Sequence, residues 1–219
     1  MSKVWLITGA SRGLGYSILR AALQDGGKVL ATARDTTRFA NLQAGYGERL
    51  ATFELDVTNE LQANEAVSEA VRRFGRLDVL VNNAGYGHIQ PFELTTAEDF
   101  RAQIETNLFG VVNLTRAAIP VMRAQGGGYI LQLSSAGGRI SSPGLSAYQA
   151  AKWAVGGFSD VVGKEVAPFG IRICTLEPGG MRTEWGLEAR STLGQLPPDY
   201  QASMADFKAL IDADRKSVV

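Results

Sequence analysis

The sequence predicts a doubly wound parallel α/β fold of the Rossmann type, a single domain of three layers in which helices cover both faces of one sheet. Short apolar segments alternate with amphipathic helical segments along the chain, which is the pattern of βαβ units. A glycine-rich turn stands between the first strand and the first helix. The length of 219 residues suits one hydrophobic core, and no repeat or linker divides it.

Each element follows from local patterning. Apolar runs predict six strands, the number of a full dinucleotide-binding sheet: Val4–Ile7, Lys28–Ala33, Leu50–Leu55, Leu77–Val81, Tyr129–Leu133 and Ile171–Leu176. Apolar residues at helical spacing predict helices over Leu14–Gln24, Thr36–Ala44, Thr58–Phe74, Ala97–Arg123, Ser146–Val166 and Ala202–Ile211. Thr95 and Glu98 are interpreted as a capping box at the start of the long fourth helix.

Composition excludes several classes of protein. Lys plus Arg equals Asp plus Glu, at 22 each, so a basic footprint for nucleic acid is absent, and no polybasic cluster suggests anionic lipid. No apolar run approaches the ~18 residues that span a bilayer. The apolar stretch Val4–Ile7 is too short for a signal peptide and runs into glycines, so we expect a cytoplasmic protein.

Cysteine and histidine usage points away from metal and nucleophilic catalysis. Cys174 is the only cysteine and lies in an apolar run, which predicts a small buried hydrophobic residue. No Cys/His cluster has metal-ligand spacing, so no metal is expected. His88 is the only histidine, so a Ser-His-Asp triad would depend on it alone. We interpret it as a loop residue at the edge of a pocket.

The glycine turn indicates a dinucleotide. Thr8 to Gly15 reads Thr-Gly-Ala-Ser-Arg-Gly-Leu-Gly, with the spacing G-x-x-x-G-x-G. Glycines let the backbone approach phosphates, and the N-terminus of the helix that follows favours their negative charge. Tight turns need glycine in any case, so the position between strand and helix carries the prediction.

The end of the second strand bears on the choice of cofactor. An acidic residue there pairs with the ribose 2′-hydroxyl of NAD, whereas an arginine accepts the 2′-phosphate of NADP. Arg34 follows Ala33, and Arg12 in the glycine turn supplies a second guanidinium, which favours NADP(H) over NAD(H). Asp35 is the competing feature, although it also suits the N-cap of the helix that follows.

Tyr148 and Lys152 are the candidate chemical centre. They lie four residues apart on a predicted helix and so share a face. Reduction of a carbonyl needs a proton donor, and a neighbouring ammonium is expected to lower the pKa of the tyrosine toward working pH. An ordinary surface pair would show the same spacing.

Taken together, the motifs resemble the short-chain dehydrogenase/reductase family over residues 4–185. The matching positions follow in the order of the family: Thr8, Gly9, Gly13 and Gly15; Asp56-Val57; Asn82-Asn83-Ala84-Gly85; Asn107; Ser135; Tyr148-x-x-x-Lys152; and Pro178-Gly179-x-x-x-Thr183. Each motif alone is common, and the ordered set is specific.

The resemblance implies roles for these residues. Tyr148 would be the general acid/base, Ser135 would hydrogen-bond the substrate oxygen, and Asn107 would bind a water that relays protons to Lys152. Ser134 competes with Ser135 for its role, and Asn107 has the alternative of a satisfied buried amide. The implied cofactor-binding residues are Gly9, Ser11, Arg12, Gly13, Leu14, Gly15, Arg34, Asp56, Val57, Asn83, Ala84, Gly85, Tyr148, Lys152, Pro178, Gly179, Met181 and Thr183.

The sequence departs from the family after Thr183. The subgroup usually continues into a substrate loop, a helix and a seventh strand, whereas only 36 residues follow here. We expect residues 184–219 to be a substrate-loop region and tail, either truncated or naturally short. Aromatic and aliphatic residues that flank the expected pocket suggest an apolar carbonyl or alcohol: Tyr86, Ile89, Phe92, Leu145 and Trp185.

The sequence also carries expectations about assembly and function. Small residues along Ser146–Val166 permit close helix packing, and the family pairs this helix across a homodimer or homotetramer interface. Tight packing on the sheet would explain them equally. The leading function is an NADP-dependent oxidoreductase. The alternatives are an NADP-binding regulator or scaffold with little turnover, and a non-redox enzyme such as an epimerase.

Overall fold

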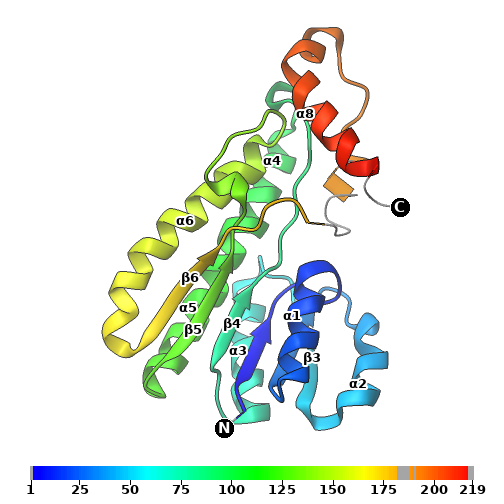
Figure 1. Ribbon diagram of the computed structural model, residues 1–219. Coiled ribbons are helices and arrows are strands. Elements are labelled where there is room, and N and C mark those ends of the chain that lie inside the picture. The colour runs from blue at the N-terminus through cyan, green and yellow to red at the C-terminus, as the bar shows by residue number, and fades with distance from the viewer. Residues whose placement is uncertain (1, 182–187, 190, 217–219) are drawn as a thin grey trace.

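The structure is a computed structural model, and it describes residues 2–181, 188–189 and 191–216. One sheet of six parallel strands forms its centre, in the order β3-β2-β1-β4-β5-β6 (Figure 1). The strands are β1 (Val4–Ile7), β2 (Lys28–Ala33), β3 (Leu50–Glu54), β4 (Val79–Asn82), β5 (Gly128–Leu133) and β6 (Ile171–Leu176). The order reverses between β1 and β4, so the carboxyl ends of these two strands border the crevice where such sheets bind ligands.

Helices cover both faces of the sheet and confirm the three-layer prediction. They are α1 (Gly13–Gln24), α2 (Ala40–Tyr46), α3 (Glu60–Phe74), α4 (Ala97–Ile104), α5 (Gly110–Ala124), α6 (Ser146–Val166) and α8 (Pro198–Lys216). Short 3-10 turns lie at Thr37–Phe39, Gly47–Arg49, Phe92–Leu94, Ala136–Gly138 and Ala167–Phe169. α1 and α2 pack on one face, and α3, α5 and α6 pack on the other.

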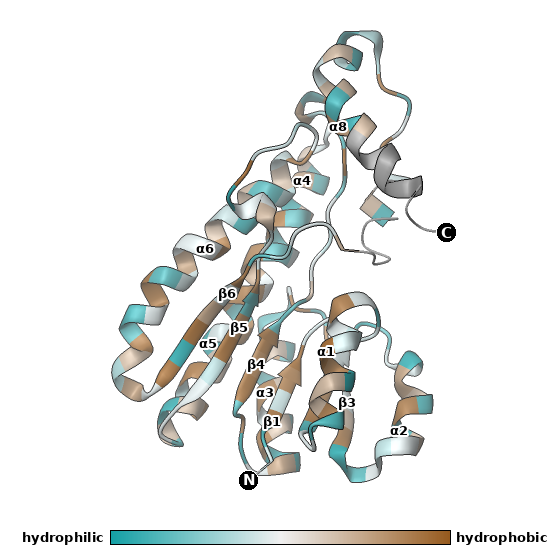
Figure 2. Ribbon diagram, in the orientation of Figure 1, coloured by the Kyte–Doolittle hydropathy of each residue, from teal (hydrophilic) through white to brown (hydrophobic). Residues whose placement is uncertain are grey.

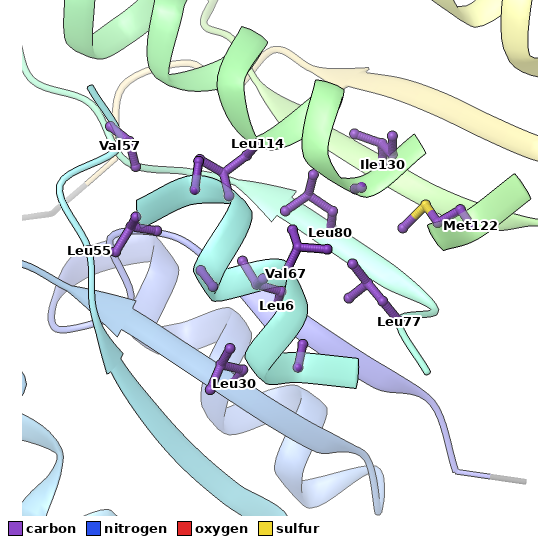
Figure 3. Packing of buried hydrophobic residues seen from close by; sticks show 14 of the residues in the cluster. Leu6, Leu30, Leu55, Val57, Val67, Leu77, Leu80, Leu114, Met122 and Ile130 are labelled. Carbon is purple, nitrogen blue, oxygen red and sulfur yellow. The ribbon is translucent and has the colours of Figure 1, made fainter. Parts of the chain in front are cut away.

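Alternation along the strands divides the core in two. Leu6, Leu30 and Leu80 point to the α3 and α5 face, where Val67 and Leu114 meet them (Figure 3). The alternate strand residues belong to the opposite core, which includes Ile7, Val29, Val79 and Val81. Successive residues of a strand face opposite sides, so two buried faces give the continuous apolar runs of a parallel sheet. Figure 2 shows these strands as largely hydrophobic.

The predicted helix Ala97–Arg123 is one continuous run in three parts. α4 passes into a π-helical segment at Glu105–Phe109, and α5 continues to Ala124. The side chain of Thr96 caps its start by accepting a hydrogen bond from the Asp99 amide at 3.1 Å. The predicted capping box of Thr95 and Glu98 is therefore wrong by one residue, because the Thr95 hydroxyl instead donates to the Pro91 carbonyl oxygen at 3.2 Å.

Cys174 is exposed, which contradicts its prediction as a buried residue. β6 is the edge strand, and Cys174 pairs with Leu131 in the register, so it faces the same side as α1. The helix α1 packs over β1 and β2 rather than over β6. Its neighbour Ile173 faces α6 and packs on the core.

A third apolar cluster joins the C-terminal segment to the end of the sheet. We call it the C-terminal cluster. Its buried members are Ile89, Leu145, Tyr148, Ala189 and Met204, with Leu193, Leu196, Tyr200 and Phe207 packed against them. The helix α8 is longer than the predicted Ala202–Ile211. Thr183 and Trp185 lie outside the described residues. Within the described ranges, no helix combines the length and apolarity needed to cross a membrane.

Candidate active site

The glycine turn brings three chain segments into close contact. Gly9 has φ +61°, and a Cβ there would lie 2.9 Å from the Cα of Ala84. A Cβ on Gly15 would lie 2.4 Å from the Gly9 carbonyl oxygen and 2.4 Å from Nδ2 of Asn83. Gly13, at φ +55°, opens α1. The turn therefore needs glycine for its shape, and it leaves the N-terminus of α1 in the crevice beside β1 and β4, the place for a pyrophosphate.

Hydrogen bonds of the Asn83 and Thr8 side chains hold this turn against the end of β4. Nδ2 of Asn83 donates to the carbonyl oxygens of Thr8 at 3.0 Å and Gly9 at 3.1 Å. The hydroxyl oxygen of Thr8 accepts hydrogen bonds from the amides of Asn83 and Ala84 at 2.9 and 3.0 Å. The family resemblance implies that Asn83 binds the cofactor, and its side chain here holds the glycine turn in shape.

Basic residues gather at the carboxyl end of β2. Arg34 follows the strand and is exposed, and Arg12 forms a bidentate pair with the carboxylate of Glu188, at 2.6 Å from Nη2 to Oε2. This contact first, and then the charges of Arg12, Arg34 and Arg38, lower the pKa of Glu188. Sequence reasoning missed Arg38, whose only signal was its position one helical turn after Arg34.

The carboxylate of Asp35 is hydrogen-bonded to Thr37, two residues further along the chain. It accepts hydrogen bonds from the amide of Thr37 at 2.9 Å and from the hydroxyl of Thr37 at 2.6 Å, and these bonds lower its pKa. The alternative prediction, that Asp35 is the N-cap of the next helix, is wrong by one residue. The N-cap of the 3-10 turn Thr37–Phe39 is Thr36, and Asp35 binds Thr37 from the position before it.

The other predicted cofactor residues lie at the carboxyl edge with differing side-chain surroundings. Oδ1 of Asp56 accepts from the Thr58 amide at 2.9 Å. Val57 is buried in the core, where a Cβ on Gly110 would lie 2.6 Å from its Cγ2. Ser11 and Leu14 are half-buried in and beside the glycine turn, Pro178 and Gly179 follow β6, and Met181 is exposed.

Lys152 is buried beneath the crevice. Its Nζ donates to the Leu133 carbonyl oxygen at 2.7 Å and lies 5.6 Å from the centroid of the Tyr148 ring. Burial lowers the pKa of Lys152 to about 8, because an ammonium is poorly solvated in the protein interior. The surface-pair alternative for Tyr148 and Lys152 is therefore excluded, since both side chains are buried.

The pKa of Tyr148 differs from the expectation. Burial raises the pKa of Tyr148, and a hydrogen bond with Ser135 opposes that rise. The C-terminal cluster covers the ring, while Leu133 holds the Lys152 ammonium. Desolvation of the hydroxyl thus outweighs the expected influence of Lys152.

The two adjacent serines have different partners. Ser135 contacts Tyr148, and its Oγ accepts from the Gly137 amide at 3.0 Å. Ser134 is buried, and its hydroxyl donates to the Lys152 carbonyl oxygen at 3.0 Å, which ties β5 to α6. Only Ser135 stands beside the tyrosine, so its position fits the predicted role.

Asn107 lies in the π-helical segment, and the two polar atoms of its side-chain amide have different surroundings. Nδ2 donates to the carbonyl oxygens of Tyr86 and Gln103, each at 2.8 Å. Oδ1 is buried, and among the described residues nothing donates a hydrogen bond to it. A Cβ on Gly85 would lie 2.5 Å from this Oδ1 and 3.5 Å from Nζ of Lys152, so both atoms border the space above Gly85. Buried polar atoms of this kind usually bind water.

The fold and the site together define a class of protein. A glycine turn lies where the strand order of a doubly wound sheet reverses, and a buried lysine stands four residues after a tyrosine that contacts a serine. This arrangement is that of an oxidoreductase that uses a nicotinamide dinucleotide. The chain belongs to the short-chain dehydrogenase family, whose model matches residues 3–194.

Curated relatives agree with this assignment. Over 218 residues the chain is 50% identical to the oxidoreductase BOA17 of Botryotinia fuckeliana, covering 99% of this chain and 78% of the relative. It is 37% identical to a 3-ketodihydrosphingosine reductase of Bacteroides thetaiotaomicron, over 98% of this chain and 78% of the relative. The protein is therefore a dehydrogenase or reductase.

Solved structures agree as well. A short-chain dehydrogenase from Streptomyces avermitilis superposes with a TM-score of 0.87 at 39% identity, over 97% of this chain and 78% of the other. A 3-ketoacyl-(acyl-carrier-protein) reductase from Brucella melitensis, complexed with NADH, gives 0.79 at 33% identity, over 83% and 76%. ElxO with NADP bound gives 0.81 at 33% identity, over 87% and 77%. The cofactor class is thus a nicotinamide dinucleotide.

Proposed function

We propose that this protein is an NADP-dependent oxidoreductase that transfers a hydride between the nicotinamide and a carbonyl or secondary alcohol. The observation that carries the proposal is the juxtaposition of Tyr148 with Ser135 and of Lys152 with the open Oδ1 of Asn107. The nicotinamide supplies or accepts the hydride when it is bound. The glycine turn Thr8 to Gly15 would hold its pyrophosphate, and Lys152 its ribose hydroxyls.

Each of the four residues has a distinct task in this proposal. Tyr148 donates the proton to the substrate oxygen in reduction and accepts it in oxidation. Ser135 donates a hydrogen bond to the same oxygen and steadies the charge that develops there. Lys152, with a pKa near working pH, restores the proton of Tyr148. Asn107 holds a water at Oδ1 that connects Lys152 to solvent.

Replacement of the tyrosine tests the reaction. We expect Tyr148→Phe to bind NADPH with nearly the wild-type dissociation constant, measured by fluorescence, and to lose about 100-fold or more in turnover on a panel of carbonyl compounds. Tyr129→Phe is the matched control, because Tyr129 is half-exposed on β5. Turnover by Tyr148→Phe within a few-fold of wild type would remove Tyr148 from this role.

The arginines support NADP over NAD. A 2′-phosphate would replace the Glu188 carboxylate as the anion among Arg12, Arg34 and Arg38, whereas the acidic Asp35 is already bound to Thr37. We expect Arg34→Ala to lower kcat/KM for NADPH about tenfold or more and to leave that for NADH nearly unchanged. The exposed Arg20→Ala is the control. Equal losses with the two cofactors would contradict the preference.

The substrate side supports an apolar small molecule. Ile89 and Leu145 pack with Tyr148 in the C-terminal cluster. Residues 184–219 are proposed as the substrate-loop region. Phe92, in contrast, is exposed and packs edge-on against Phe100. The relative named as a 3-ketodihydrosphingosine reductase suggests a keto group on an apolar chain. A cytoplasmic location and a homo-oligomer, paired through α6 and α5, complete the proposal.

A further inference from the structure

The orientation of the Asn107 amide depends on the chain around it. Two carbonyl oxygens, of Tyr86 and of Gln103, accept from Nδ2. A flipped amide would turn Oδ1 toward both carbonyl oxygens, which repel it, so the flip is disfavoured as long as both stay in place. The Gln103 carbonyl is fixed by its helix. The Tyr86 carbonyl belongs to a loop. The Tyr86 side chain forms a hydrogen bond with Thr106 of the helical run, and the residues that follow Tyr86 are held by contacts of their own.

Gln103 holds the loop through a closed ring of three hydrogen bonds. Its Oε1 accepts from the backbone amide of His88 at 3.1 Å. Its Nε2 donates to Oδ2 of Asp99 at 2.9 Å. The other carboxylate oxygen of Asp99 lies 2.7 Å from Nδ1 of His88, which must carry the proton because a carboxylate only accepts. The loop is thus bound through both the backbone and the side chain of His88.

The position of Gln103 in the helix links this ring to the site. Asp99, Gln103 and Asn107 are spaced by four residues, so they lie on one face of the continuous helix. Gln103 has 1% of its surface exposed. Most buried polar atoms have a hydrogen-bond partner, and both polar atoms of the Gln103 side chain do. Asp99 and His88 are partly exposed. The ring therefore runs from the surface to the buried residue that precedes Asn107 by one turn.

We propose that Gln103, through the ring it forms with His88 and Asp99, is a positioning residue that aims the Asn107 carboxamide at the space shared with Lys152. This inference rests on the proposed function. Gln103 itself does not touch the reacting atoms. It fixes the Tyr86 carbonyl, which in turn fixes Nδ2 of Asn107 and leaves Oδ1 directed to the space above Gly85.

The first test removes the ring without changing side-chain volume much. We expect Gln103→Leu to lower kcat about tenfold or more, because a misplaced group is costly to catalysis, while KM for NADPH changes less than about twofold. Gln132→Leu is the matched control. Gln132 is also a buried glutamine with two side-chain partners, Asn82 and Thr115, and its loss is expected to lower stability without the selective fall in kcat.

A second measurement needs no substrate. In Gln103→Leu the amides of Tyr86–Ile89 are expected to exchange hydrogen about fivefold faster, which corresponds to the loss of one hydrogen bond of ~1 kcal/mol. Gln132→Leu is expected to leave that exchange unchanged. Unaltered exchange in Gln103→Leu overturns the inference even if the protein turns over nothing on the panel, whereas failure of the proposed function is decided by Tyr148→Phe.

An exchange of partners provides the rescue. In the double variant Asp99→Asn with Gln103→Glu, the carboxylate and the amide trade places. The introduced glutamate then accepts from the His88 backbone amide and from the side-chain nitrogen of the introduced asparagine, whose side-chain oxygen accepts from Nδ1 of His88. We expect Gln103→Glu alone, with two carboxylates facing each other, to lose kcat, and the double variant to regain at least half of that loss on a logarithmic scale. A double variant no better than Gln103→Glu contradicts the ring.

Discussion

Lys152 shows at the scale of one residue how the fold shapes the chemistry. A lysine in water is charged up to a pH near 10.5, but burial lowers the pKa of this one to about 8. The Leu133 carbonyl accepts from its Nζ, and one hydrogen bond does not replace full hydration. Lys152 therefore exchanges a proton in the pH range where an enzyme works, at the expense of stability while it is charged.

The cost of this buried charge predicts how stability depends on pH. Between about pH 8 and 10.5 the unfolded chain holds the Lys152 proton and the folded chain has released it, so stability rises with pH across this window. We expect the unfolding free energy of wild type, relative to Lys152→Met, to increase by up to roughly 3 kcal/mol from pH 8 to 10.5.

Urea unfolding at several pH values measures this difference. Below pH 8 both states of wild type hold the proton, so the difference between wild type and Lys152→Met is expected to stay constant there. Lys164→Met is the matched control, because Lys164 is exposed on the same helix. Curves for wild type and Lys152→Met that run parallel through pH 10.5 would show that Lys152 is not a buried titrating group.

Residue identity in the site was predictable, and side-chain direction was not. Motif order marked Asn107, Ser135, Tyr148 and Lys152, and the structure brings all four to one place beside the glycine turn. The sequence could not reveal that Ser134 bonds the helix backbone while Ser135 meets the tyrosine. It also could not reveal the sign of the Tyr148 pKa shift, since burial by residues distant in the chain decides it.

At the scale of elements, periodicity located the sheet well. Val4–Ile7, Lys28–Ala33 and Ile171–Leu176 coincide with the observed strands, because residues buried on both faces leave an unbroken apolar run. Periodicity did not reveal the π-helical turn at Glu105–Phe109. That turn inserts a residue without breaking the apolar pattern, and such turns are frequent at functional sites.

The wrong prediction of burial for Cys174 also comes from reading the apolar pattern alone. An apolar run predicts two covered faces, yet β6 is an edge strand with one face open among the described elements. A hydrophobic pattern indicates that a segment can be buried, whereas strand order and helix placement decide whether both of its faces are covered. These are properties of the assembled sheet.

At the scale of the whole molecule the protein has two parts. We call the sheet with its packed helices the body, and the described C-terminal residues 188–189 and 191–216 the cap. The two main cores belong to the sheet and the helices α1, α2, α3, α5 and α6. The cap contacts the body through the C-terminal cluster and through a few polar contacts. The Thr192 hydroxyl oxygen accepts a hydrogen bond from the Ile89 amide at 2.8 Å. The hydroxyl of Tyr200 donates a hydrogen bond to Glu93. In Figure 1, α8 lies beyond the end of the sheet, near α4. The cap thus covers Tyr148 without being part of the main cores.

This division predicts different outcomes for two buried methionines. Met204 has 1% of its surface exposed and packs near Gly144 and Ile89, and Met122 is fully buried between α5 and the sheet. Truncation of a buried methionine to alanine costs about 2–5 kcal/mol. In Met122→Ala the whole fold loses that energy, so Tm is expected to fall by many degrees.

In Met204→Ala the same loss is expected to release only the cap, because local opening there needs less energy than global unfolding. Tm then changes little, while the amides of residues 199–209 exchange hydrogen much faster than in wild type, and KM for an apolar substrate rises. Calorimetry and hydrogen exchange on the two variants separate these outcomes. Equal losses of Tm in Met204→Ala and Met122→Ala would mean that the cap and the sheet unfold as one cooperative unit, and that access to Tyr148 is not governed by α8.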